Sequence, residues 1–176
     1  MGRGPEFVVD LLLAHLQARI PVRLVALRAE LALGLAELPD VASWHHPRDV
    51  GLIPVEEFPA VMVATYEAGT LADQGNAAGG GREYLLRYRV RAYVMARAEG
   101  AEETGRARSR YLLAAREALL AGVRAPLVGP AGLVNAPIDA SSYRESYSEI
   151  DRLAGAGTVG AAYAEVELTL AEVLPA

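Results

Sequence analysis

Two adjacent histidines are the residues whose type most directly suggests chemistry. His45 and His46 are followed by Asp49, and all three are residue types that bind metal ions. Adjacent histidines point apart on a regular backbone, and no separated third ligand is evident. The sequence therefore predicts a surface loop here and no metal site.

A glycine run and a serine pair are the next candidates. Gly79, Gly80 and Gly81 precede Arg82, but a phosphate-binding loop needs a helix after its glycines, and here a strand is expected. Ser141 and Ser142 lack the Gly-x-Ser-x-Gly context of a nucleophile elbow.

The remaining titratable candidates also have ordinary interpretations. His15 lies on an apolar helix face, where a hydrogen-bonded core histidine is more usual than a base. Glu102 and Glu103 match the acidic first turn of a helix. Taken together, the sequence predicts no catalytic residue, no cofactor and no metal, and hence a protein that is not an enzyme.

A row of arginines lies in the segment around which the chain is organised, residues 83–98. Apolar residues alternate there with a second set that contains Arg87, Arg89 and Arg91, which we call the arginine stripe. This period of two predicts a β-strand whose apolar side faces a core and whose arginine side faces water or a partner. At ~3.3 Å per residue the strand would extend roughly 45 Å, long enough to reach a neighbouring subunit.

A second strand of the same kind is predicted at residues 161–174, with Glu165 and Glu167 on its outer side. Opposite charges on facing strands stabilise a sheet, so these glutamates are candidates to stand across from the arginine stripe. If the two strands are not neighbours within one subunit, the same charges are available to meet between subunits. The stripe is also compatible with nucleic-acid binding, but a net charge of −5 argues against it.

Composition limits the class of protein. At 176 residues with 52% hydrophobic residues, the chain is expected to form a single α+β domain, residues 1–176. The absence of cysteine excludes disulfides and thiolate chemistry. No signal peptide or membrane-length apolar run is evident, which predicts an intracellular protein or part of an assembly built inside a cell.

The expected order of elements is α-α-β-β-α-β-β, with a mainly antiparallel sheet packed by helices. An N-terminal helical region, 5–37, divides at Pro21 into helices 5–18 and 22–37, with Leu24, Leu27, Leu31 and Leu35 on the buried face of the second. A short strand is expected near 50–55, then strands at 59–68 and 83–97, a helix at 101–122, a loop at 123–142, and strands at 142–152 and 161–174.

Between the second and third of these strands, residues 67–82 are expected to form a long glycine-rich loop. Such loops are usually functional or disordered, so this one is predicted to become ordered only against a partner. Its polar residues Asp73, Gln74 and Asn76 join the two charged strands as candidate subunit-interface residues.

This layout resembles the tail terminator, or tail completion, proteins of long-tailed non-contractile bacteriophages. The features that carry the resemblance are the N-terminal helical region, the strand entry Phe58-Pro59-Ala60-Val61-Met62-Val63 and the long loop. They continue with the arginine-alternating strand, the helix 101–122 and the closing strand 161–170.

The resemblance implies a hexameric ring at the head-proximal end of the tail tube, which caps tube growth and offers the docking surface for the head. Its implied partners are further copies of itself, the major tail tube protein and the head-tail connector protein. DNA would only pass through the lumen and no membrane would be involved. The implied location is the virion, with assembly in the host cytoplasm.

Three alternatives stay open from the sequence. A head-side neck protein has a similar small α+β plan. A small soluble enzyme or ligand-binding domain would need a pocket with perturbed titratable groups. A toxin or secretion-system domain related to tail tubes is the third.

Overall fold

The structure, a computed structural model, describes residues 4–46, 57–76, 81–153 and 157–174. It has two helices, one five-stranded sheet and one two-stranded sheet. In chain order the elements are α1 (Gly4–Leu31), β1 (Ser43–His45), β2 (Ala60–Asn76), β3 (Arg82–Ala98), α2 (Ala101–Ala121), β4 (Leu127–Gly129), β5 (Gly132–Val134), β6 (Ile138–Leu153) and β7 (Gly157–Leu174).

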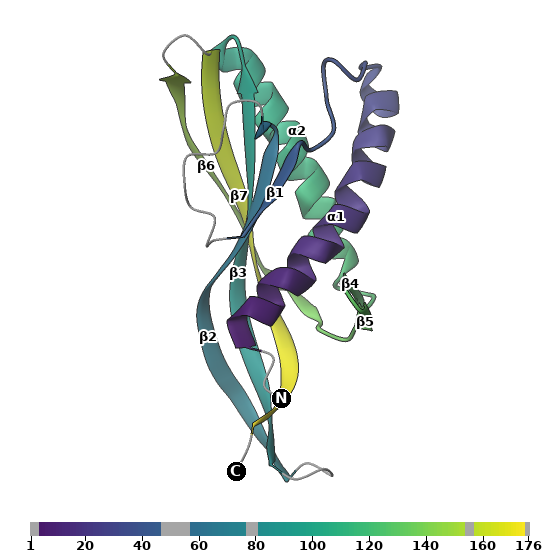
Figure 1. Cartoon of the computed structure of the whole chain (residues 1–176), viewed down its shortest axis with the longest axis vertical. Coiled ribbons are helices and arrows are strands. Elements are labelled where there is room, and N and C mark those ends of the chain that lie inside the picture. The colour runs from purple at the N-terminus through teal and green to yellow at the C-terminus, as the bar shows by residue number, and fades with distance from the viewer. Residues whose placement is uncertain (1–3, 47–56, 77–80, 154–156, 175–176) are drawn as a thin grey trace.

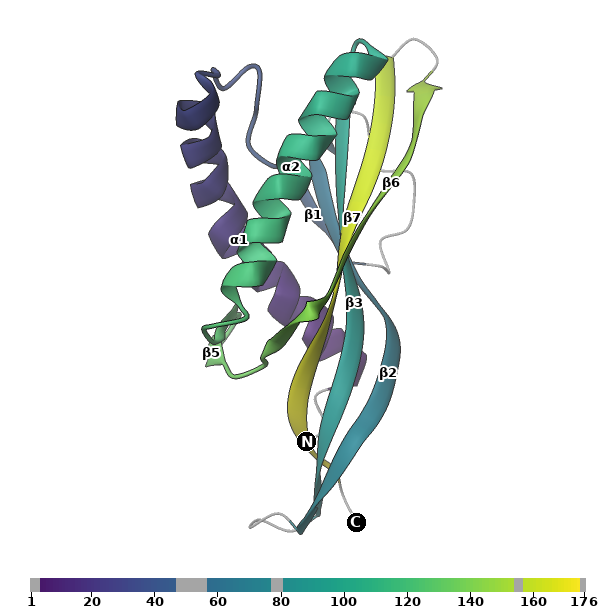
Figure 2. The same ribbon diagram turned by 180° about the vertical axis from the view of Figure 1, so that it is seen from behind.

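The large sheet has the strand order β1-β2-β3-β7-β6. All its pairings are antiparallel except that of β1 with β2. Helices α1 and α2 lie on the same side of this sheet, and the long strands extend past them at the end where the chain termini lie (Figures 1 and 2). The predicted class, an α+β fold with a mainly antiparallel sheet packed by helices, is therefore confirmed.

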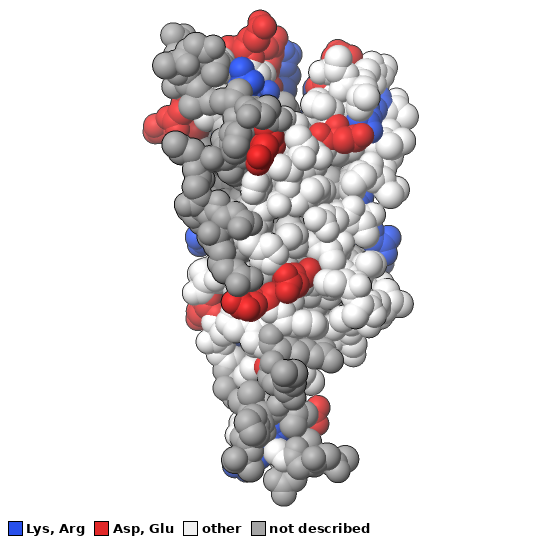
Figure 3. All heavy atoms as spheres, in the orientation of Figure 1, with Lys and Arg blue, Asp and Glu red and all other residues white. Residues whose placement is uncertain are grey.

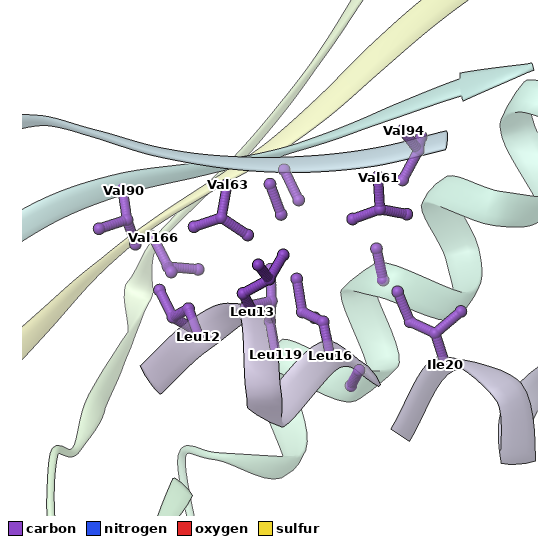
Figure 4. Close-up of a cluster of buried hydrophobic side chains, with 14 of the residues drawn as sticks. Leu12, Leu13, Leu16, Ile20, Val61, Val63, Val90, Val94, Leu119 and Val166 are labelled. Carbon is purple, nitrogen blue, oxygen red and sulfur yellow. The ribbon is translucent and has the colours of Figure 1, made fainter. Parts of the chain in front are cut away.

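The core lies between the two helices and the sheet face that they cover. Apolar side chains from α1, α2 and three strands meet there (Figure 4). They include Leu12, Leu16 and Ile20 of α1, Val61 and Val63 of β2, Val90 and Val94 of β3, Leu119 of α2 and Val166 of β7. Each such side chain, fully buried, contributes about 1.5–3 kcal/mol relative to an exposed one.

The two strongly alternating segments are direct neighbours, as their matching patterns indicate. β3 pairs with β7 over its whole length, and Val90 and Leu168 are each 1% exposed. Both apolar sides face the core and both charged sides face away. The prediction that the apolar side of the first strand faces a core is confirmed, and the two strands are neighbours within one subunit.

One buried carboxylate breaks the apolar side of β7. Glu172 is 3% exposed and accepts hydrogen bonds from the hydroxyl of Tyr88 at 2.6 Å and from the backbone N–H of Gly4 at 3.3 Å. Gly4 is the first residue of α1, and the free N–H groups and dipole of a helix N-terminus favour a negative charge. Glu172 thus ties the start of α1 to the sheet.

The division of the N-terminal region into two helices is wrong. α1 is one helix of 28 residues that contains Pro21 and bends along its length (Figure 1). Proline removes one backbone hydrogen bond and usually kinks a helix. Burial of Ile20 before it and Leu24 after it holds both halves against the core, so packing outweighs the local preference.

The end of this helix also differs from the expectation. α1 ends at Leu31. Leu24 and Leu27 are buried as expected, but Leu31 and Leu35, which were expected on the same buried face, are 48% and 60% exposed. Ala32 has a left-handed φ of 52°, and the N–H of Leu33 bonds back to the carbonyl of Arg28. This is the geometry of a helix C-terminal cap, which ends the helix before residue 37.

The predicted loop at 67–82 is also wrong for most of its length. Residues 67–76 continue β2 and pair with β3 from Glu67↔Arg89 to Asn76↔Arg82. One register shift precedes this pairing, between Thr65 and Glu67, and two interrupt it. Gly69 and Gly75 further obscure the alternation, so the segment lacks a regular period. Residues 77–80 of the expected loop lie outside the described residues.

The remaining elements are partly as expected. The strand expected near 50–55 falls outside the described residues. β6 begins at Ile138 rather than 142, and the segment expected as a loop before it contains the small hairpin of β4 and β5. The short strand β1 was not expected, because three residues are too few to show a period.

Candidate subunit-interface surface

The side of the sheet turned away from the helices is called here the outer face. Neither α1 nor α2 covers it, because both lie on the opposite side (Figures 1 and 2). The strict alternation of β3 and β7 places their polar side chains on this face as a direct consequence of the two-residue period. The candidate interface residues of these strands therefore lie together.

Cross-strand register sets the charges opposite one another. Arg89 stands across from Glu167, and Arg91 across from Glu165. Nε and Nη2 of Arg89 lie 2.9 Å and 2.6 Å from Oε1 of Glu167, and Nε of Arg91 lies 2.8 Å from Oε2 of Glu165. The arginines and glutamates that the sequence suggested as partners meet within one subunit.

Two further contacts extend this network. Nη1 of Arg87 lies 3.3 Å from Oε2 of Glu167, and Nη1 of Arg89 lies 2.9 Å from Oε2 of Glu67 on β2. Three arginines thus meet three glutamates, and the network carries no net charge. A neutral network offers little attraction to phosphate groups, so this face is poorly suited to electrostatic binding of nucleic acid.

Aromatic rings surround Arg91, the last arginine of the stripe. The guanidinium carbon of Arg91 lies 4.2 Å from the ring centroid of Tyr66 and 4.6 Å from that of Tyr163, and the rings of Tyr163 and Tyr93 are 5.4 Å apart. Such stacking holds a guanidinium in one orientation while leaving its charge partly neutralised. These four residues, Tyr66, Arg91, Tyr93 and Tyr163, are called here the Tyr–Arg plate.

The pKa values of two residues at this plate, Tyr66 and Glu165, are shifted from their usual values. Burial, together with a hydrogen bond to Glu165, raises the pKa of Tyr66 to about 12. Partial burial alone would raise the pKa of Glu165, but hydrogen bonds from Tyr66 and Arg91 outweigh it and keep that pKa below its usual value. Tyr66 therefore stays neutral and Glu165 stays ionised across the neutral range, which suits a contact surface rather than a proton-transfer site.

The hairpin of β2 and β3 carries the other candidate interface residues. Asp73 accepts from the backbone N–H of Gly75 at 2.9 Å, and its Oδ2 lies 3.1 Å from Nη2 of Arg82. Gln74 is exposed, and the backbone of Asn76 pairs with that of Arg82. These residues lie toward the far end of the extended hairpin, at a distance along the strand from the Tyr–Arg plate.

Residues of β2 complete the outer face, and sequence reasoning missed them. Tyr66 and Glu67 were assigned to a strand end and a loop, and Tyr93 and Tyr163 were seen only as members of alternating patterns. The sequence signal that could have indicated them is the presence of tyrosines at outward-facing positions next to the charged residues of each strand. Their contact with Arg91 depends on the register of three strands, which the sequence alone does not show.

The histidine pair has no metal-binding geometry in the part that the structure describes. Nε2 of His45 lies 3.4 Å from Glu57, whereas Nε2 of His46 lies 3.1 Å from Asp10 on α1, so the two rings face different carboxylates. Asp49 falls outside the described residues. Within those residues, no cluster of three or more potential ligands is present.

The other chemical candidates have structural partners. Ser142 accepts from the backbone N–H of Glu167 at 2.7 Å, and its hydroxyl donates to the carbonyl of Asp139. His15 is 1% exposed, lies 2.9 Å from the carbonyl of Ala118 through Nε2, and accepts from the N–H of Val128 at 3.1 Å through Nδ1. The prediction that His15 is a hydrogen-bonded core histidine is confirmed.

No protein-family model matches the chain, and a search of curated proteins finds no significant match. None of the described helices has the length and apolar character needed to cross a lipid bilayer.

Proposed function

We propose that this chain is a structural protein of a phage tail, a tail terminator whose ring caps the tail tube and provides the head-docking surface. The observation that carries the proposal is the outer face, a sheet surface of long strands that neither helix covers and that presents ordered tyrosines and arginines. Tyrosine and arginine are the residue types enriched where protein interfaces derive most of their binding energy.

The internal pairing of the arginine stripe supports a contact role. An arginine that already stacks on rings and bonds a carboxylate has lost its side-chain freedom before any partner arrives. Binding then costs less conformational entropy than it would with free side chains. A network without net charge can also be covered by another copy without strong repulsion.

The proposed partners are those that the resemblance implies. Copies of this chain would form a hexameric ring, which needs head-to-tail contacts that close on themselves. One rim of the ring would meet the major tail tube protein and the other the head-tail connector protein, and DNA would pass through the lumen. The mature location would be the head-proximal end of the tail, after assembly in the host cytoplasm.

Several of the candidate chemical groups take part in the fold. His15 is used in packing, Ser142 holds a strand bulge, and the arginine stripe holds neighbouring strands together. In each case the polar atoms that chemistry would need are engaged in the fold.

Addition of the purified protein to growing tail tubes tests this proposal. A terminator is expected to bind one tube end and stop elongation at a few copies per tube, measured by tube length in electron micrographs. The single variant Tyr66→Asp should fold but lose this activity, while Leu133→Asp, at an exposed position on the small hairpin, should keep it. Tubes that elongate equally with and without the protein would contradict the proposal.

A ligand-binding role is the second candidate, favoured by one cavity. A cavity of about 450 Å³ opens between the end of α1, the end of β3 and α2, with Arg97, Arg106, Arg110 and Tyr111 among its lining residues. Volumes of this size hold small ligands. Thermal unfolding in the presence of small dicarboxylates and phosphate esters tests it, because a bound anion should raise the midpoint of wild type but not of Arg110→Ala.

A further inference from the structure

One end of the molecule contains the cavity between the end of α1, the end of β3 and the first turns of α2. Its volume is about 450 Å³. In Figure 3 the molecule is hollowed at this end, at the top of the view, and charged side chains of both signs flank the hollow. A cavity of this size holds a small organic molecule, and the lining residues decide which chemical class fits.

The walls of this cavity are held in place before any ligand binds. The hydroxyl of Tyr111, a buried residue of α2, donates to the carbonyl of Pro39 at 2.7 Å. Arg28 of α1 donates to the carbonyl of Leu38 and to the carboxylate of Asp40, each at 2.8 Å. The segment after α1 is thus fixed to both helices, so binding would not have to order it.

Much of the lining is apolar. The apolar residues come from the segment after α1, from β3 and from α2, and include Ala36, Pro39, Ala96 and Ala107. Small side chains of this kind leave room for an apolar group and offer it no side-chain hydrogen bond. A ligand with an apolar body would displace water from this part of the cavity, which is favourable.

Three arginines also line the cavity, and their charges are not equally balanced. Arg97 already has an interaction partner, and Nη1 of Arg106 lies 3.4 Å from Oε1 of Glu102, one turn earlier on α2. Arg110 is half-buried, yet within the part of the chain that the structure describes it forms no hydrogen bond or ion pair. Because a charge removed from water is usually paired, Arg110 is the group in the cavity best suited to hold an anion.

The carboxylates of the lining limit the charge of such an anion. Glu37 and Glu103 line the same cavity as Arg110, so a second negative group on the ligand would be repelled by them. One negative charge therefore fits better than two. A carboxylate is well suited, because its two oxygens accept parallel hydrogen bonds from one guanidinium.

From these observations we infer that the cavity binds a small organic acid with one carboxylate and an apolar body. The carboxylate bonds to Arg110, and the apolar body lies against Ala36, Ala96 and Ala107. The inference rests on the ligand-binding role given as the second candidate function, and it names the class of ligand. Capping of tail tubes does not depend on it.

A series of four ligands with the same length of carbon chain tests the inference. Hexanoate has one carboxylate, hexanamide lacks the charge, adipate has a second carboxylate, and hexyl phosphate carries a phosphate in place of the carboxylate. Each is titrated into the full chain at pH 7, and the dissociation constant is measured by calorimetry. We expect hexanoate to bind at least tenfold more tightly than each of the other three.

Two arginine variants locate the site. Arg110→Gln removes the charge and should weaken hexanoate binding at least tenfold, whereas Arg124→Gln, at an exposed position outside the cavity lining, should leave it unchanged. Since Arg110 has no ion pair within the described residues, Arg110→Gln should unfold at a temperature no lower than Arg124→Gln. That comparison separates loss of the ligand from loss of the fold.

Three results would overturn the inference. Hexanamide, adipate or hexyl phosphate bound as tightly as hexanoate would exclude the proposed class but leave a ligand-binding role in place. Hexanoate binding that is equal in Arg110→Gln and Arg124→Gln would show that the ligand does not use Arg110. Binding of none of the four compounds would contradict this inference and the ligand-binding role together.

Discussion

Nη2 of Arg89 on β3 lies 2.6 Å from Oε1 of Glu167 on β7, and the two residues are direct partners in the register of the sheet. This pair stands at the centre of the outer face, where it also joins Glu67 and Arg87 into one network. The charges that were candidates for a contact between subunits therefore first stabilise the subunit itself. Any experiment on them has to separate the two effects.

A charge swap makes that separation. Arg89→Glu should lower the denaturant midpoint, because it places a third carboxylate beside Glu67 and Glu167. The double variant Arg89→Glu with Glu167→Arg restores an opposite pair and should recover more than half of that loss. If the outer face is an interface, the double variant should still assemble poorly. A double variant no more stable than Arg89→Glu alone would contradict the pairing.

The left-handed residue at the end of α1 predicts a stabilising substitution. Ala32 has a φ of 52°, a conformation that glycine adopts without the steric cost of a Cβ atom. Ala32→Gly should therefore raise the free energy of unfolding by roughly 0.5–1 kcal/mol, measured by urea denaturation. Ala29→Gly, three residues earlier inside the helix, is the matched control and should lower it by a similar amount. Equal effects of both substitutions would contradict the assignment of the cap.

The first residue of β7 predicts a destabilising substitution. Gly157 has a φ of +82°, and a Cβ atom there would lie 2.4 Å from the carbonyl oxygen of Ala98. Gly157→Ala should cost about 2 kcal/mol or more, because both backbone strain and a clash with rigid backbone oppose it. Gly100→Ala is the control, since a Cβ atom at Gly100 meets nothing within 4 Å. Thermal unfolding compares the two variants.

His15 predicts a dependence of stability on pH. Burial is the main cause that lowers the pKa of His15 below 6.5, so the neutral ring is the folded form. Below pH 6.5, His15 binds a proton in the unfolded chain but remains neutral in the folded one. The free energy of unfolding should therefore decrease as the pH falls from 6.5 to the lowered pKa of the folded state. Comparison of urea unfolding at pH 8 and pH 5 measures this effect.

Substitution of His15 provides the control for that experiment. His15→Leu leaves the carbonyl of Ala118 and the N–H of Val128 without their partner, which should cost about 1–3 kcal/mol at pH 8. The same variant should lose part of the pH dependence. A pH dependence unchanged from that of wild type would contradict the assignment of the effect to His15.

Much of the fold was predictable because two strands alternate without interruption. The periods in β3 and β7 predicted their orientation, their buried sides and the match of Arg89 and Arg91 to two glutamates. Where the chain departs from a regular period, prediction failed. The bulges of β2 interrupt its period, so ten strand residues were predicted as a loop. Burial of Ile20 and Leu24 keeps α1 helical across Pro21, although proline by itself favours a break in the helix.

The composition of the candidate site was less predictable than its position. Arg87, Arg89, Arg91, Glu165 and Glu167 are visible as charged residues of two strands, but Tyr66 and Glu67 join them only through the register of a third strand. Local patterns determine which side a residue faces. Which residues stand side by side across strands is set by turns and bulges, and these leave weak signals in one sequence.

The proposal that this chain caps the tail tube is best tested by the length of tails assembled without it. The measurement is electron microscopy of a lysate from the phage with this gene deleted, with tube lengths compared with those of the intact phage. We expect filled heads without tails, and free tails whose tubes extend beyond the normal length. Complete, infectious particles would contradict it, and unjoined tails of normal length would indicate a head-side neck protein instead.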